Sequence, residues 1–325
     1  MPSHAPNTKI QLRALVQNLL ARDGPACSLN HIDVSNITDF SYTFMNLTFH
    51  GDASSWRMSQ ARNVRHMFEK ASLATDLSMW DTSNVEDFSA MFEGACGRVG
   101  DIGLWNTRSA QSMAAMFANS SLRADLRHWD VAHVRNFARM FQGYKSLAHL
   151  AHWDTSSATL MSAMFEGADM QEDLARWDVS NVLSFHGMFA HSAFNGDISK
   201  WCVRRGQNFG QLFERSSFAG DISGWVFGDT LSSVAFDDAM DKSSLAATPT
   251  CTIHWYWAWG ASPIERDRWL NQEQGQFFLR HAPMLEALDT PRIGAAKALQ
   301  LLWLERDQAK PAPDSLALPA FDELC

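Results

Sequence analysis

Acidic side chains recur at a fixed place in the sequence, four residues before a tryptophan. They are Asp52, Asp76, Asp101, Asp125, Asp173, Asp197 and Asp221, and His149 takes the place once. Carboxylates repeated on parallel turns of chain could bind calcium in a ladder. They could instead accept backbone N–H groups within turns. The second reading is favoured, because glycine-rich calcium loops are absent, so we expect neither a metal nor a cofactor.

Basic and acidic residues also recur on either side of the tryptophans. The residue before each tryptophan from Trp80 to Trp201 is, in order, Met79, Leu104, His128, His152, Arg176 and Lys200, with Ser55 and Gly224 at the two ends of the series. In three consecutive units the residue directly after the tryptophan is acidic, namely Asp130, Asp154 and Asp178. On stacked strands each set would form a row. The rows could recognise an acidic protein partner, or they could be a solvated face whose charges satisfy each other. His128 and His152 could share a metal ion, but no third ligand is evident from the spacing.

No motif of a known enzyme class stands out. The chain has no GxSxG, HExxH, phosphate-binding loop or dinucleotide fingerprint. Serine and aspartate are abundant, but they occur as repeats, whereas a catalytic group is normally unique. We therefore expect no catalytic residues.

Residues from about 29 to 245 follow one period. Thirteen Trp and 21 Phe are present among 325 residues, and a tryptophan returns every 24 residues, once after 25, from Trp56 to Trp225. Most of these tryptophans are followed, twelve residues later, by a phenylalanine, as Trp80 is by Phe92. Such a period predicts stacked units that bury a common core. A propeller blade needs about 40 to 45 residues and is excluded.

Within a unit, the apolar spacing predicts the elements. Val85, Phe88, Phe92 and Ala95 have helical spacing, with Ser83 as N-cap and Glu86 completing a capping box. The stretch "DLSMW" before Trp80 is predicted to be a short strand. The fold expected is an α/β repeat solenoid, leucine-rich-repeat-like, with one short strand, a turn and a short helix in each 24-residue coil.

Four regions are expected along the chain. Residues 1–28 form an N-terminal capping helix from about Lys9 to Arg22, residues 29–245 form the solenoid, residues 246–310 form a C-terminal helical cap, and residues 311–325 form an extended tail. The aromatic residues could stack on nucleic-acid bases, but their periodicity assigns nearly all of them to the interior.

Several quoted stretches resemble the BspA-like leucine-rich-repeat family of bacterial surface proteins. They are "LNHIDVSNITDFSYTF" at 29–44, "WDVSNV" at 177–182, "MF" at 188–189 and "FNGDISKW" at 194–201. The resemblance covers roughly residues 29–245. It implies a leucine-rich-repeat-like solenoid used for adhesion or partner binding, with no catalytic residues to transfer.

The charge and composition bound the partners. The formal net charge of -9 argues against binding to nucleic acid or to an anionic membrane. No apolar run is long enough to insert into a membrane, and the first residues do not read as a signal peptide, so a cytoplasmic location is expected, while the resemblance leaves the cell surface open. The five cysteines form no disulfide or zinc pattern.

Three functions stay open at this level. The first is a non-enzymatic module that binds a protein through the row before the tryptophans. The second is a structural subunit of a larger complex, docked by its C-terminal helices and tail. The third, which is less supported, is an enzyme with its site in residues 246–310.

Overall fold

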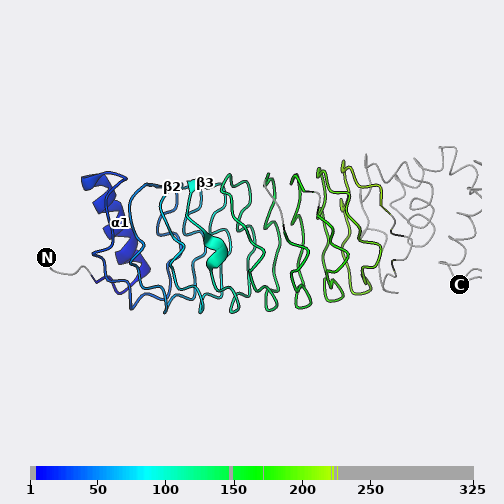
Figure 1. The fold of residues 1–325 in the computed structure, drawn as a ribbon, viewed down its shortest axis with the longest axis horizontal. Coiled ribbons are helices and arrows are strands. Elements are labelled where there is room, and N and C mark those ends of the chain that lie inside the picture. The colour runs from blue at the N-terminus through cyan, green and yellow to red at the C-terminus, as the bar shows by residue number, and fades with distance from the viewer. Residues whose placement is uncertain (1–4, 146–148, 171, 221, 223–224, 226–325) are drawn as a thin grey trace, which may run out of the picture.

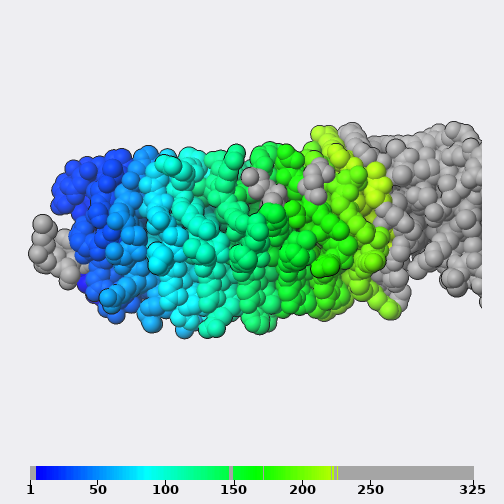
Figure 2. Space-filling view, in the orientation of Figure 1, coloured from blue at the N-terminus to red at the C-terminus, as the bar shows by residue number. Residues whose placement is uncertain are grey.

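The chain forms a column of repeating units stacked along one axis. The computed structural model describes residues 5–225, apart from 146–148, 171, 221 and 223–224. Figure 1 shows helix α1 at one end, followed by upright turns of chain that lie side by side in sequence order. In the space-filling view the same units form narrow bands of an unbroken surface (Figure 2).

Aromatic rings fill the interior of the column. The rings of Phe44, Phe68, Phe92, Phe117, Phe141, Phe165, Phe189 and Phe213 follow one another with centroids 5.0 to 5.9 Å apart. Pairs of tryptophans also stack, such as Trp56 on Trp80 at 6.0 Å with 4° between the ring planes. All these rings are buried. The prediction that the periodic aromatics form the core is therefore confirmed, and base stacking by them is wrong, because they do not reach solvent.

Each indole also ties its unit to the one before. The Nε1–H of Trp80 donates to the carbonyl oxygen of Ala53, and the other seven repeat tryptophans do the same one unit apart, at 2.8 to 3.2 Å. A buried N–H needs such a partner, because leaving it unpaired costs about 1–3 kcal/mol. The tryptophan therefore fills the core and also hydrogen-bonds its unit to the preceding one.

Helix α1 closes the first unit. It spans Lys9–Asp23, with Thr8 as N-cap and Gly24 as C-cap at a φ of 84°. Its apolar stripe of Leu12, Val16 and Leu19 is buried against the first units. At the same end Lys9 pairs with Asp39 at 2.8 Å, and Nη2 of Arg13 donates to the carbonyl oxygen of Met45 at 3.4 Å. The helix predicted from about Lys9 to Arg22 is thus present.

Regular strands are few and short. Strands β1 (Thr48–Phe49), β2 (Ser72–Ala74) and β3 (Cys96–Arg98) pair in parallel, in the order β1-β2-β3. A Cβ at Gly97 would overlap the carbonyl oxygen of Leu73, so β3 packs against β2 at a distance that only glycine permits. Elsewhere in each unit, single parallel bridges link it to the next, as Asp87 pairs with Asn63 and with Ser112.

The α/β leucine-rich-repeat-like solenoid is wrong, because the described units contain no α-helix. Between Val85 and Ala95 the backbone makes successive turns, and Ala90 and Gly94 have φ values of 54° and 65°, which a right-handed helix does not allow. Here Ser83 caps no helix; its N–H donates to Asp81. Outside α1, the described chain has one further helical segment, the 3-10 helix η1 at Ile102–Leu104.

Hydrogen bonds along the axis take the place of helical ones. The N–H groups of Phe88, Ala90, Phe92 and Gly94 donate to carbonyl oxygens of the next unit at 2.7 to 2.9 Å, and those of Met91 and Ala95 close local turns. The same alternation recurs from unit to unit. Because every second residue bonds outside its own unit, the apolar side chains share one face without forming a helix.

The strand predicted before each tryptophan is also wrong. Ser78 and Met79 lie in a turn, in which Oδ1 of Asp76 accepts the N–H of Ser78 at 2.9 Å. A side-chain acceptor competes with strand pairing at such a place. The predicted C-terminal helices and tail, residues 246–325, and Asp221 lie outside the described residues. In the part of the chain described, no helix has the length and apolar character needed to cross a bilayer.

Candidate functional site

Six exposed side chains precede the buried tryptophans of successive units. We call Met79, Leu104, His128, His152, Arg176 and Lys200 the corner row, and all six are exposed. Met79 is 78% exposed and Leu104 is 67% exposed. Because these two occupy equivalent places in adjacent units, they form an apolar spot at one end of the row, and the basic side chains continue it.

The turns of the backbone, rather than strands, position the corner row. The tryptophan after each member is buried and hydrogen-bonded to the preceding unit, as Trp105 is to the carbonyl oxygen of Leu77 at 2.9 Å. Leu104 lies on η1, in the unit that spans 25 residues, and Asp101 accepts the N–H of Gly103 there. Parallel chains lie about 4.8 Å apart, so neighbouring members of the row are close enough for one partner to touch several.

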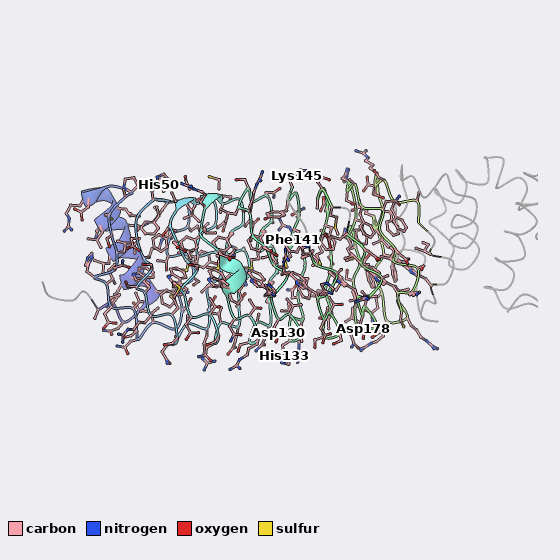
Figure 3. All side chains as sticks on the ribbon, viewed as in Figure 1. His50, Asp130, His133, Phe141, Lys145 and Asp178 are labelled. Carbon is pink, nitrogen blue, oxygen red and sulfur yellow. The ribbon has the colours of Figure 1, made fainter. Side chains whose placement is uncertain are left out.

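The acidic residues after the tryptophans, Asp130, Asp154 and Asp178, form a second exposed row. In each, Oδ1 accepts the N–H two residues later, at 2.9 to 3.1 Å. Figure 3 places Asp130 and Asp178 along the lower edge of the column, away from Lys145 at the upper edge. Each of these carboxylates therefore shapes its own turn and still faces solvent.

Local hydrogen bonds lower the pKa of two turn aspartates, Asp154 and Asp76. Those from Ser156 hold the pKa of Asp154 below its ordinary value of 3.8, and the nearby His133 acts in the same direction. The pKa of Asp76 is lowered in the same way by Ser78. The charged form of each carboxyl is thus the one that the fold stabilises.

The aspartates four residues before the tryptophans serve the backbone, as predicted. Asp52, Asp76, Asp101, Asp125, Asp173 and Asp197 each accept the N–H two residues later. Within the described residues, no group of three or more His, Cys, Asp or Glu side chains is placed to hold a metal ion. His128 and His152 belong to no such group.

Sequence reasoning missed a groove beside the acidic row. It has a volume of about 620 Å³ and is lined by Glu86, Arg108, Ser109, Gln111, Asp130, His133, Arg135 and Ser157. The signal was available in the repeat itself. Arg108 stands three residues after its tryptophan, where most units have serine or alanine, as at Ser83 and Ala132.

Comparison with known proteins gives a family but no function. A family model described as "Mycoplasma protein of unknown function, DUF285" matches residues 26–124, 72–173 and 145–245. The proposed resemblance to the BspA-like leucine-rich-repeat family is therefore wrong, because the matching family is a different one. No curated protein and no solved structure matches the chain. Since the three matches together cover more than half of its length, this repeat protein belongs to the DUF285 family.

Proposed function

We propose that the protein is a non-enzymatic module that binds another protein through the corner row. The observation that carries the proposal is the exposure of Met79 and Leu104 in adjacent units. The other large hydrophobic side chains exposed in the described chain are Ile10, Tyr42 and Leu160. Adjacent exposed apolar side chains flanked by charges are typical of protein interfaces.

The charges of the row favour an acidic partner. His128, His152, Arg176 and Lys200 follow the apolar spot in consecutive units. Arg176 forms no ion pair with any residue that the structure describes, so its guanidinium is available to a carboxylate from outside. Such contacts mainly raise the association rate and select the partner.

The way each unit is built allows the side chains of the corner row to vary. The side chains of the row point to solvent, whereas the tryptophans, phenylalanines and turn aspartates hold each unit in place. A side chain of the row can therefore change without disturbing the core. A cytoplasmic location remains part of this proposal, and fractionation of the source cells would test it.

Affinity capture from native extract tests the proposal. A triple variant, with His152→Ala, Arg176→Ala and Lys200→Ala, should retain the fold by circular dichroism and capture less partner. A matched control replaces one arginine and one lysine elsewhere, Arg98→Ala and Lys145→Ala, and should capture as much as the native chain. Undiminished capture by the triple variant would reject the corner row.

The same capture experiment distinguishes this function from a second one, in which the protein is a structural subunit of a larger complex and docks through its C-terminal residues. That surface lies in residues 246–325, outside the described residues. If removal of residues 311–325 abolishes capture and the triple variant does not, the partner docks on the C-terminal part. The reverse result supports the corner row.

A further inference from the structure

We infer that the groove beside Asp130 binds an acidic peptide segment of the partner protein. The inference rests on the proposed function, because it adds a second contact for the same partner. Asp130 and His133, which line the groove, lie together at the lower edge in Figure 3. The basic groups that would hold the segment are Arg108, Arg135 and His133.

The backbone fixes one wall of the groove as a ladder. The N–H of Gln111 donates to the carbonyl oxygen of Glu86 at 2.8 Å, and the N–H of Arg135 donates to that of Gln111 at 2.9 Å. The next residues, Asp87, Ser112 and Asn136, form parallel bridges in the same order. Glu86, Gln111 and Arg135 are thus consecutive rungs, about 4.8 Å apart.

On this wall the acidic residue, Glu86, is already in a salt bridge, whereas the basic residue, Arg135, is in none among the described residues. Oε1 of Glu86 lies 2.6 Å from Nη1 of Arg62 on the preceding rung. Arg135 has the neutral Gln111 on one side and the neutral Thr159 on the other, where the N–H of Thr159 donates to the carbonyl oxygen of Arg135. Among the described residues, nothing forms a salt bridge with the guanidinium of Arg135.

Two other lining residues add further positive charge. Arg108 is exposed, and its side chain also has no hydrogen-bond or ion-pair partner among the described residues. His133 is exposed and interacts electrostatically with Asp154. Asp130 is the one unpaired acid of the lining, and its Oδ1 is occupied by the N–H of Ala132 at 3.1 Å. Two unpaired guanidinium groups therefore face a groove with one partly occupied carboxylate.

These arginines are not required by the repeat. The place of Arg108 is taken by Ser59, Ser83, Ala132, Ser156 and Ser180 in other units, and once by another arginine, Arg204. That of Arg135 is taken by Thr38, Gln111, Thr159, Leu183 and Gln207, and by the charged Arg62 and Glu86. Units with small or neutral side chains at these places stack in the same way. The two guanidinium groups are thus an addition to the scaffold, suited to a ligand.

The dimensions favour an extended chain over a small ion. The lining runs from the unit of Glu86 to the unit of Ser157, which is three steps of about 4.8 Å, or about 14 Å. An extended peptide covers that distance with about four residues at about 3.3 Å each. Carboxylates bind guanidinium groups with two parallel hydrogen bonds, so a segment with glutamate or aspartate at alternate positions fits.

Fluorescence anisotropy with the purified full-length chain tests the inference. The probe is a fluorescein-labelled peptide of alternating glutamate and serine, measured at low and at physiological salt. The double variant Arg108→Ala with Arg135→Ala should bind at least about tenfold more weakly, because it loses the charge-assisted hydrogen bonds from both guanidinium groups to the peptide carboxylates. The matched control, Arg98→Ala with Arg123→Ala, also removes two exposed arginines from adjacent units and should bind within about twofold of the native chain.

Several results would overturn the inference. They are no saturable binding of the acidic peptide, equal binding of a glutamine and serine peptide, or an equal loss in both double variants. Competition by inorganic phosphate that is stronger than competition by the unlabelled peptide would indicate a small-anion site instead. The proposed function is tested separately, by capture of the partner from native extract. If the variant with Arg108→Ala and Arg135→Ala still captures the partner and the triple corner-row variant captures less, the groove inference is wrong and the proposed function is supported.

Discussion

The indole Nε1 of Trp80 lies 3.0 Å from the carbonyl oxygen of Ala53, 27 residues earlier in the chain. The same ring stacks on Trp56 of the preceding unit, nearly parallel. One side chain therefore provides both a directional bond and an apolar contact across the junction between two units. The stacking of units depends on this pair of contacts, because each unit is too small to bury its own apolar face.

Trp80→Phe should lower the free energy of unfolding by about 3 kcal/mol. The substitution removes ring volume and the indole hydrogen bond to the carbonyl oxygen of Ala53, which keeps the N–H of Trp56 as a donor. Urea denaturation followed by tryptophan fluorescence measures the effect. Met79→Ala, one residue away and exposed, is the control and should change stability by less than about 0.5 kcal/mol. Equal effects of the two substitutions would contradict the role of Trp80 in holding two units together.

Acid should weaken the column through the turn aspartates. Hydrogen bonds from Ser78 lower the pKa of Asp76 below 3.8, so the unfolded chain takes up its proton first as the pH falls. The stabilisation is complete above the unfolded pKa and is lost as the pH falls through 3.8 toward the folded value. Asp76→Ala should destabilise the chain at neutral pH by about 1 kcal/mol.

Asp76→Asn is the matched comparison for this turn. The amide oxygen can still accept the N–H of Ser78, but it does not ionise. Melting temperatures between pH 3 and pH 7 should therefore show a smaller acid dependence in Asp76→Asn than in the native chain. An unchanged acid dependence would mean that this carboxylate does not contribute to it.

Alkali should act on Tyr144. Its hydroxyl donates to the carbonyl oxygen of Leu122 at 2.6 Å, and burial raises its pKa above 10.0. The unfolded chain loses this proton first, so the stabilisation is complete below pH 10 and falls as the pH rises from there toward the folded pKa. Tyr144→Phe should cost about 1 kcal/mol at neutral pH and reduce the alkaline loss. Tyr42→Phe, at an exposed ring, is the control at neutral pH and should change stability by less than about 0.5 kcal/mol.

Val16→Asp should detach helix α1 from the first units. Val16 is fully buried, and an unpaired carboxylate there has to reach water. Loss of the helix would expose the apolar end of the stack and promote self-association. Size-exclusion chromatography with light scattering measures it. Gln17→Asp, on the exposed face of the same helix, should stay in the native state of association. The same state of association in both variants would show that α1 does not shield the apolar end of the stack.

Part of the candidate site follows from the repeat. The exposure of the corner row could be predicted, because each member stands beside a periodic tryptophan that has to be inside. The groove could not be predicted in this way, since it depends on how Arg108 of one unit and Arg135 of the next lie across the stack. Departure from the repeat, read at those two places, is the sequence signal that points to it.

The sequence by itself determined the period, the inward rings, helix α1, and the role of aspartates such as Asp76 in turns. It did not determine the backbone between Val85 and Ala95, where the spacing predicted a helix and the structure has turns with axial hydrogen bonds. Apolar spacing reports which side chains face the core, and both backbones satisfy it. Only the stacked neighbour decides the difference, because the N–H of Phe88 finds its acceptor in Ser112 of the next unit rather than within its own.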